Sequence, residues 1–133
     1  MSRANIEAIR ASYDALNRRD YETWVASLHP DIELHELASN PDAGVYRGHD
    51  GVRRWIESVW EVSAPGSRFE PERLVEVGDL ILVSVRASMR SPRSSVPIEA
   101  RLFHVIEMSE GRGRRIWGYL DEAEALEAVG LRE

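Results

Sequence analysis

Cysteine and lysine are absent from the sequence, and so is any long apolar run. The lack of cysteine excludes disulfides, thiolate catalysis and cysteine-based zinc sites. A membrane-spanning helix needs about 20 largely apolar residues, so we expect no contact with a membrane. The N-terminal segment MSRANIEAIRASY also lacks the apolar region of a secretion signal. Together these absences predict a cytoplasmic protein.

The sequence has no excess of positive charge and no common ligand motif. Its formal net charge is −6, which argues against binding to nucleic acid. The four histidines show no metal-ligand spacing, and the segment GVYRGHDG matches neither a P-loop nor a G-x-G-x-x-G loop. We therefore expect no metal, no nucleotide and no other cofactor.

Apolar residues at helical spacing predict three helices in the first half of the chain. Asp20 is expected to cap the second helix, and Pro30 to end it, because the residue before a proline avoids helical angles. Asp50 is expected to cap the third helix. The inward residues are Ile6, Ile9, Tyr13 and Leu16 in the first helix, Tyr21, Trp24, Val25 and Leu28 in the second, and Val52, Trp55, Ile56 and Val59 in the third.

Alternating apolar and polar residues predict strands in the rest of the chain. The segment DIELHEL (residues 31–37) alternates, as do residues 68–77, 80–90, 98–108 and 114–120, and short turns connect the last four as antiparallel hairpins. A final short helix is expected to start at Asp121 and to end at Gly130. With no repeat or linker, residues 1–133 form one α+β domain in which three helices cover one face of a curved antiparallel sheet.

Three segments resemble the NTF2-like superfamily, and more narrowly its SnoaL-like polyketide cyclases and ketosteroid isomerases. They are YDALNRRDYETWVASLHPDIELHE, YRGHDGVRRWIESVW and HVIEMSEGRGRRIWGYLDEAEALEAVG, and they cover nearly the whole chain. The resemblance implies a cone-shaped fold with a mostly apolar pocket at its open end. It also implies a homodimer formed through the outer face of the sheet. Because the superfamily holds many activities, the fold alone does not define one.

His104 is the first candidate catalytic residue. Strand alternation places it on one face with Leu102, Ile106 and Met108. The resemblance implies that this position points into the pocket, where ketosteroid isomerases hold a protonated acid that donates to the substrate oxygen. A buried imidazole tends to stay neutral and can still donate one hydrogen bond. The alternative is a core histidine bonded to a backbone carbonyl or a buried water.

Glu36 is the second candidate. It shares a strand face with Ile32 and Leu34, and by resemblance it matches the general-base aspartate of the ketosteroid isomerases. A carboxylate at the rim of an apolar pocket suits proton abstraction. The alternative is a solvated loop residue. A shift of one residue in the strand would put His35 in the place of Glu36.

Arg86 is the third candidate, and two interpretations of its strand remain open. Hydrophobicity alone leaves Arg86 outside and sends the alternate residues of the strand to the core. These alternates are Ile81, Val83, Val85, Ala87 and Met89. Limonene-epoxide hydrolases, by contrast, carry an inward Arg-x-Asp motif on this strand. If Arg86 faces inward, it is expected to pair with Glu36 or an anionic ligand, and the apolar set would form a dimer interface.

The sequence also departs from both enzyme families. Ser88 stands in place of the motif's aspartate, Gly118 in place of another hydrolase aspartate, and Ser12 beside Tyr13 where isomerases use a tyrosine. On the last strand, Ile116, Gly118 and Leu120 are expected to face inward, with Trp117 and Tyr119 facing a partner subunit. The residues expected to contact a ligand are Trp24, Trp55, Leu82, Ser84, Ser88, Ile106 and Gly118. For the two tryptophans, the alternative is a place in the core behind the pocket.

These residues predict a pocket that binds a small apolar or polyketide-like molecule. Cofactor-free proton transfer in an isomerisation, cyclisation or dehydration is the expected chemistry. Glu36 would take the proton while His104, helped by Arg86, stabilises negative charge on oxygen. The alternative is a non-catalytic ligand-binding or dimerisation module, which a pocket well under about 300 Å3 would favour. A further alternative is a subunit that holds another protein on its sheet.

Overall fold

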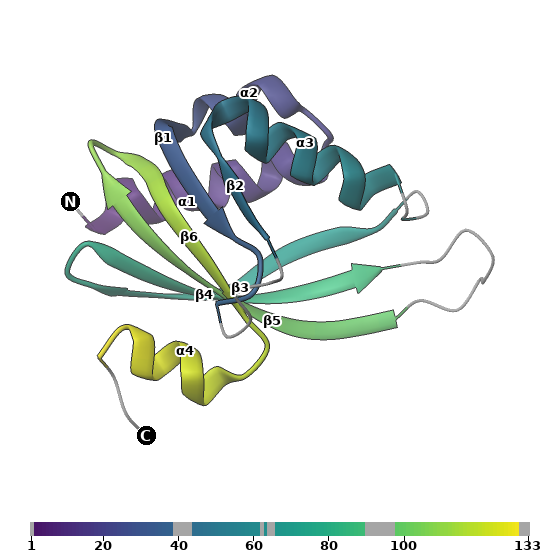
Figure 1. Cartoon of the computed structure of the whole chain (residues 1–133). Coiled ribbons are helices and arrows are strands. Elements are labelled where there is room, and N and C mark those ends of the chain that lie inside the picture. Colours follow the sequence, from purple (N-terminus) through teal and green to yellow (C-terminus); the bar gives the residue numbers. More distant parts are fainter. Residues whose placement is uncertain (1, 39–43, 62, 64–65, 90–97, 131–133) are drawn as a thin grey trace.

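The computed structural model describes residues 2–38, 44–61, 63, 66–89 and 98–130 and has the expected α+β architecture. Helices α1 (Ser2–Asn17), α2 (Tyr21–Ala26) and α3 (Gly48–Glu61) cover one face of a curved sheet. The short helix α4 (Glu122–Ala128) lies on the opposite side (Figure 1). The predicted division into an inner helical layer and a separate C-terminal helix is therefore confirmed. No helix in the described ranges is long and apolar enough to span a membrane.

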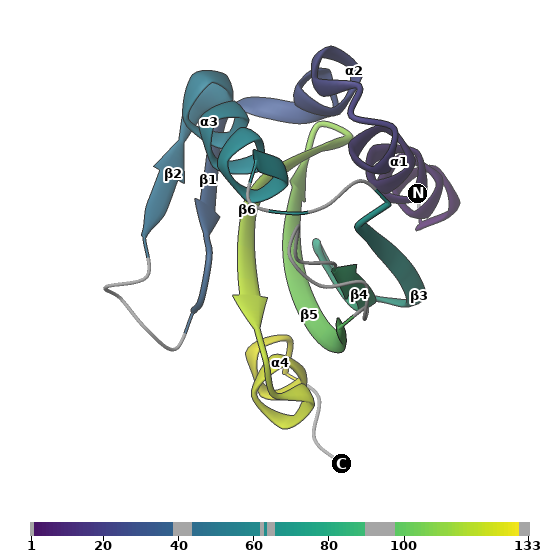
Figure 2. The same ribbon diagram turned by 90° about the vertical axis from the view of Figure 1, so that its right-hand side faces the viewer.

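Six strands form the sheet in the order β2-β1-β6-β5-β4-β3. The strands are β1 (Leu28–His35), β2 (Val45–Arg47), β3 (Arg68–Val77), β4 (Leu80–Met89), β5 (Ile98–Ser109) and β6 (Arg112–Tyr119). The hairpins from β3 to β6 are antiparallel, as predicted. Strand β1 instead runs parallel to β6 and antiparallel to the unpredicted β2 (Figure 2). Strand β1, from the first third of the chain, thus lies beside the last strand.

The start of β1 differs from the prediction. Asp20 caps α2 by accepting a hydrogen bond from the Thr23 backbone N–H at 3.2 Å. The helix ends at Ala26, however, and Leu28 and Pro30 belong to β1, so the expectation that Pro30 ends the helix was wrong. Pro30 is tolerated because the pairing of β1 with β6 is irregular between Leu28 and Glu33, and a proline fits where the ladder is interrupted.

Helix α1 is fixed against the sheet by one side chain at its end. The Asn17 amide donates to the carbonyl of Phe69 at 2.8 Å and accepts from the Phe69 backbone N–H at 2.9 Å. These two bonds satisfy backbone groups at the start of β3. They also set the height at which the inward face of α1 crosses the strands. The third helix begins at Gly48, so Asp50 lies in its first turn rather than at its cap, where a carboxylate still favours the helix dipole.

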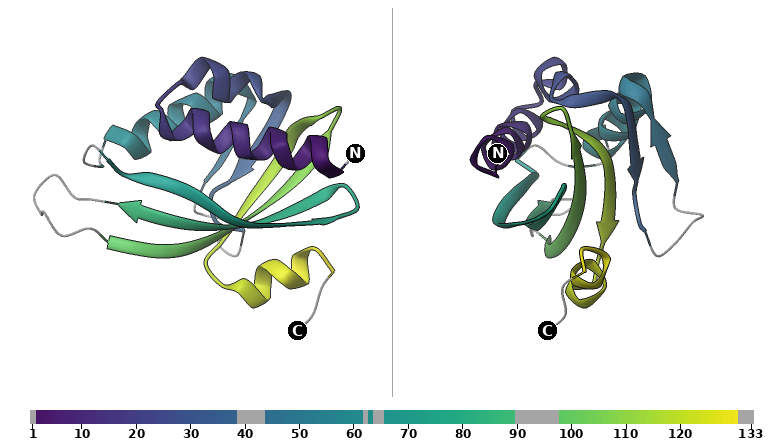
Figure 3. Two further views of the ribbon diagram at one scale, coloured as in Figure 1. Left: turned by 180° about the vertical axis from the view of Figure 1, so that it is seen from behind. Right: turned by 90° about the vertical axis from the view of Figure 1, so that its left-hand side faces the viewer.

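Strand β4 separates two apolar clusters. Ile81, Val83, Val85 and Ala87 face the helices and are buried in the main core. On the outer face, Leu82 packs with Phe103 and Val105 against Ala125 and Val129, so that α4 covers this part of the sheet (Figure 3). The alternation in β4 therefore has the orientation that hydrophobicity alone predicted.

The end of β6 follows the expected alternation only in part. Trp117 and Tyr119 face outward, as predicted, and pack against the outer cluster beside α4. Leu120 was expected to face inward, but it lies beyond the end of the strand and is 64% exposed. The expectation for Leu120 was wrong because β6 ends at Tyr119 and the chain leaves the sheet there toward α4.

Candidate functional site

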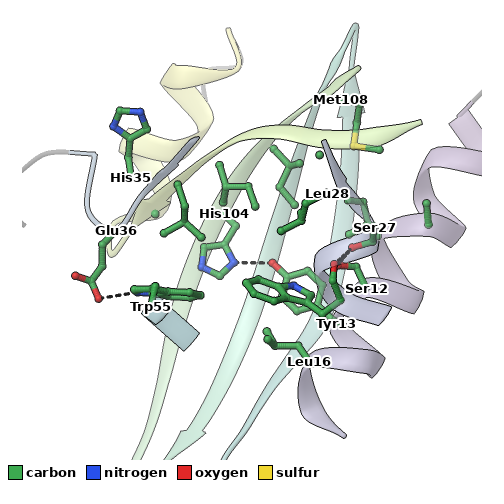
Figure 4. A pocket seen from close by; sticks show the side chains of 18 residues that line it. Ser12, Tyr13, Leu16, Ser27, Leu28, His35, Glu36, Trp55, His104 and Met108 are labelled. Atoms are coloured by element: carbon green, nitrogen blue, oxygen red, sulfur yellow. Dashed lines mark hydrogen bonds between the residues drawn. The ribbon is translucent and has the colours of Figure 1, made fainter. Parts of the chain in front are cut away.

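An apolar pocket lies between α1, α2 and the inner face of β1, β5 and β6, with one residue from α3 (Figure 4). Its volume is about 60 Å3. These six elements span the sequence from the first helix to the last strand, so the site exists only in the folded chain. The lining residues are Ala8, Ile9, Ser12, Tyr13, Leu16, Trp24, Ser27, Leu28, Leu34, His35, Glu36, Trp55, His104, Ile106, Met108, Gly113, Ile116 and Gly118.

Tyr13 and His104 form a hydrogen-bonded pair in this pocket. Tyr13 lies on the inward face of α1 and His104 on the inward face of β5, and Oη of Tyr13 is 2.5 Å from Nδ1 of His104. Burial disfavours the charged form of each group. It lowers the pKa of His104 to about 4 and raises the pKa of Tyr13 well above its usual value. Both groups are therefore neutral near pH 7.

The second ring nitrogen of His104, Nε2, has no hydrogen-bond partner among the described residues. It faces the part of the pocket where Trp55 lies (Figure 4). A neutral imidazole carries one N–H and one acceptor nitrogen. When the Tyr13 hydroxyl donates to Nδ1, Nε2–H is free to donate to a ligand; in the other tautomer, Nε2 is free to accept. The partner of Nδ1 is thus a side-chain hydroxyl and not the backbone carbonyl of the core alternative; the role of His104 toward a ligand stays a prediction.

Glu36 follows the last residue of β1 and lines the same pocket as His104. Its Oε2 accepts a hydrogen bond from Nε1 of Trp55 at 3.1 Å (Figure 4). The His35 ring instead stacks on Trp117, with 5.9 Å between the ring centroids, and lies 3.1 Å from Oε1 of Glu33. The side chain that faces the inner side is thus that of Glu36, as the alternation with Ile32 and Leu34 predicted.

Two serines mark another part of the pocket, at the side of α1 and α2. The Ser27 hydroxyl donates to the Trp24 carbonyl at 2.5 Å, so its oxygen is left to accept from Ser12 at 3.0 Å. Ser12 stands at the position where the resemblance places the tyrosine of the isomerases. The hydroxyl that reaches His104 comes instead from its neighbour Tyr13. The helical spacing identified Tyr13 only as an inward residue; its pairing with His104 gave no sequence signal.

Arg86 does not reach the pocket, so the interpretation that placed it inside was wrong. It is exposed on the outer face, where its guanidinium lies 3.6 Å from Glu70 and 4.0 Å from Glu72. The predicted contact residues Leu82, Ser84 and Ser88 share its strand face and also lie outside the pocket. The reason is burial: β4 places its apolar alternates in the core, and a lone buried guanidinium would be very costly. These apolar alternates are consequently no dimer interface.

The other predicted contact residues do line the pocket: Trp24, Trp55, Ile106 and Gly118. Their contact with a ligand remains a prediction. Gly118 has a clear structural role, because a Cβ at this position would lie 2.3 Å from the Glu36 carbonyl oxygen. The backbone also bonds here, with Ala38 N–H donating to the Gly118 carbonyl at 2.8 Å. The aspartate that hydrolase relatives carry here therefore has no room.

Comparison with known proteins identifies the family. The model of the SnoaL-like domain matches residues 9–116. The chain belongs to the SnoaL-like family. No curated protein matches this SnoaL-like sequence.

Solved structures share the SnoaL-like fold over almost the full chain. TerC, co-crystallised with polyporic acid, is 28% identical with a TM-score of 0.77 over 95% of this chain and 98% of its own. An NTF2-like protein of unknown function from Burkholderia pseudomallei is 25% identical, with a TM-score of 0.76 over 96% and 98%. An LEH-like epoxide hydrolase from M. tuberculosis is 18% identical, with a TM-score of 0.72 over 95% and 89%; this likeness concerns the fold alone.

Proposed function

We propose that this SnoaL-like protein binds a small, largely apolar molecule in the pocket and transfers a proton on it without a cofactor. The observation that carries the proposal is the Tyr13–His104 pair: two neutral groups joined at 2.5 Å inside an apolar cavity, with Nε2 free toward a ligand. The co-crystal of TerC with polyporic acid supports the binding of a small organic molecule by this fold.

The chemistry that the arrangement supports is removal and return of a proton beside a carbonyl group. In the tautomer in which Tyr13 donates to Nδ1, Nε2–H of His104 donates to the ligand oxygen as negative charge develops there. Glu36 takes the proton from the adjacent carbon and returns it to another carbon. Trp55 holds the carboxylate in place through its indole N–H. Arg86 has no part in this scheme.

A second function, ligand binding without catalysis, is favoured by the size of the pocket. At about 60 Å3, the cavity is far below the roughly 300 Å3 of a site for a drug-sized ligand. A polyketide-sized molecule would enter only if lining side chains moved apart. With the side chains as they stand, the ligand is therefore much smaller than a polyketide in either function.

The test uses a small β,γ-unsaturated ketone, 3-cyclohexenone, whose isomerisation to the conjugated ketone needs only one proton removed and one returned. We expect the wild-type protein to accelerate this reaction, and Glu36→Gln to lower the rate by about 100-fold or more. Glu33→Gln, on the outer face of the same segment, is the matched control and should retain the rate.

Binding is measured in parallel from the side-chain 15N signals of His104. Shifts of these signals with no turnover would favour the binding-only function. If neither the His104 signals nor the reaction rate responds to the ketone or to a library of similarly small molecules, the proposed use of this pocket fails.

A further inference from the structure

We infer that the ligand of this pocket carries an amine or ammonium group, held by the Glu36 carboxylate and the rings of Trp24 and Trp55. The inference rests on the proposed function, because it names the chemical class of ligand for the same pocket. It requires in addition that the pocket select for positive charge, which the proposed function does not.

The charges of the lining residues are the first argument. Neither arginine nor lysine lines the pocket, and the carboxylate of Glu36 forms no ion pair within the described ranges. Its recorded hydrogen bond comes from a neutral indole N–H. A carboxylate on the wall of the pocket attracts a cation by direct Coulomb attraction. An anionic ligand would meet this charge with no cationic side chain to offset it.

The second residue to consider is His104, which does not oppose the selection for a positively charged ligand. A histidine that was charged at neutral pH would repel an ammonium group in so small a cavity. Burial lowers the pKa of His104 to about 4, and the Tyr13 hydroxyl stays protonated. The neutral Tyr13–His104 pair therefore places no positive charge opposite the Glu36 side chain, and the ring of the other lining histidine, His35, is turned toward Trp117 and Glu33.

The hydrogen-bond donors of two lining groups are already used, which is the second argument. The Trp55 indole N–H is bound to Glu36, and the Ser12 hydroxyl hydrogen is directed to Ser27. Both Glu36 and Ser12 consequently line the pocket with side chains whose oxygens can still accept a hydrogen bond. A ligand that donates hydrogen bonds, as an amine does, satisfies them; a ligand that only accepts does not.

The aromatic rings are the third argument. Trp24 and Trp55 both line the pocket, with ring centroids 6.2 Å apart and planes tilted by 36°. The faces of tryptophan rings attract cations, and aromatic side chains commonly surround substituted ammonium groups. Tyr46 supports Trp55, with a centroid distance of 6.4 Å. A volume of about 60 Å3 suits a head group of a few heavy atoms.

The experiment compares three probes of nearly equal shape: choline, its uncharged carbon analogue 3,3-dimethyl-1-butanol, and the anion 3,3-dimethylbutanoate. Affinities are measured by NMR titration at neutral pH. We expect choline to bind at least about tenfold more tightly than the alcohol, and the anion to bind most weakly. Glu36→Gln should reduce the preference for choline over the alcohol to about one, whereas Glu33→Gln should retain it.

The outcomes separate this inference from the proposed function. If the alcohol binds as tightly as choline to the wild type, the inference is overturned, and the proposed function stands on the binding of a neutral molecule. If none of the three probes binds and the ketone also fails, both are overturned. The comparison of probes on the wild type does not depend on how well the Glu36 variant folds.

Discussion

Tyr13 and His104 lie 91 positions apart in the sequence and are joined by a hydrogen bond of 2.5 Å inside the pocket. The bond connects the inward face of α1 to the inward face of β5. It fixes the orientation of the imidazole and leaves one ring nitrogen for a ligand. Four predictions follow from this pair and from the backbone and surface contacts around it.

Replacing Tyr13 by phenylalanine should release the His104 ring and lower the stability of the protein. The loss of one buried hydrogen bond, with Nδ1 left unpaired, is expected to reduce the free energy of unfolding by about 1–2 kcal/mol. Long-range 1H–15N spectra should show His104 changing from one dominant tautomer to a mixture. Tyr21→Phe is the control, because the Tyr21 hydroxyl has no hydrogen bond within the described part of the chain. Equal effects of the two substitutions would contradict this role.

Stability should fall as the pH is lowered through the range between the two pKa values of His104. The folded-state pKa is about 4, below the unfolded value of about 6.5. The unfolded chain therefore takes up a proton first, so the contribution is fully present above about pH 6.5 and is lost toward pH 4. Between about pH 7.5 and pH 5 the loss should reach about 2 kcal/mol.

The measurement is urea unfolding of the wild type and of His104→Asn at both pH values. The asparagine cannot titrate but retains a polar group near the position of Nδ1. Carboxylates that titrate near pH 5 affect both proteins alike and cancel in the difference. Parallel loss of stability in the two proteins would show that His104 is not desolvated in the folded state.

Gly118→Ala should destabilise the protein strongly, because the new Cβ would lie 2.3 Å from a backbone oxygen of Glu36. A backbone group cannot rotate away as a side chain can, and we expect a loss of about 3 kcal/mol or more. Gly51→Ala is the matched control: its Cβ would meet the Tyr46 backbone at 3.5 Å, an ordinary contact within α3. A gain of about 0.5–1 kcal/mol is expected there. Thermal unfolding should separate the variants in opposite directions.

Arg86→Ala should have little effect on either stability or ligand binding. Its contacts with Glu70 and Glu72 at 3.6 and 4.0 Å lie on the exposed outer face, and such ion pairs contribute about 1 kcal/mol or less. Calorimetric titration with whichever probe binds the wild type provides the test. A large loss of affinity in Arg86→Ala, with the fold intact, would place the guanidinium near the ligand after all.

The sequence predicted those features that depend on local pattern. Alternation in β4 assigned Val83 and Val85 to the core, and alternation in β1 turned Glu36 inward. The orientation of Arg86 was left open because a motif from relatives opposed this alternation, and the structure follows the alternation. Burial of apolar area decides the orientation of this strand. The Arg-x-Asp motif, which here lacks its aspartate because Ser88 stands in that place, does not change this orientation.

Features that join distant segments could not be predicted. The three residues of β2 are too few for a period, and the parallel pairing of β1 with β6 has no local signal. The Tyr13–His104 contact depends on the height at which α1 crosses the sheet, which the two bonds between Asn17 and Phe69 help to fix. Helical spacing gave the direction of Tyr13 but not its partner.

The parallel contact of β1 with β6 also determines when the cavity is completed. Its wall needs Leu34 from the first third of the chain beside Ile116 from the last fifth. On a ribosome, helices α1 to α3 and strand β1 emerge long before β6, the strand that closes the wall. The indole and carboxylate groups of the early segments stay open to water until β6 has been synthesised. Contacts of such long sequence separation make folding slow, so this closure is a natural late step in the maturation of the protein.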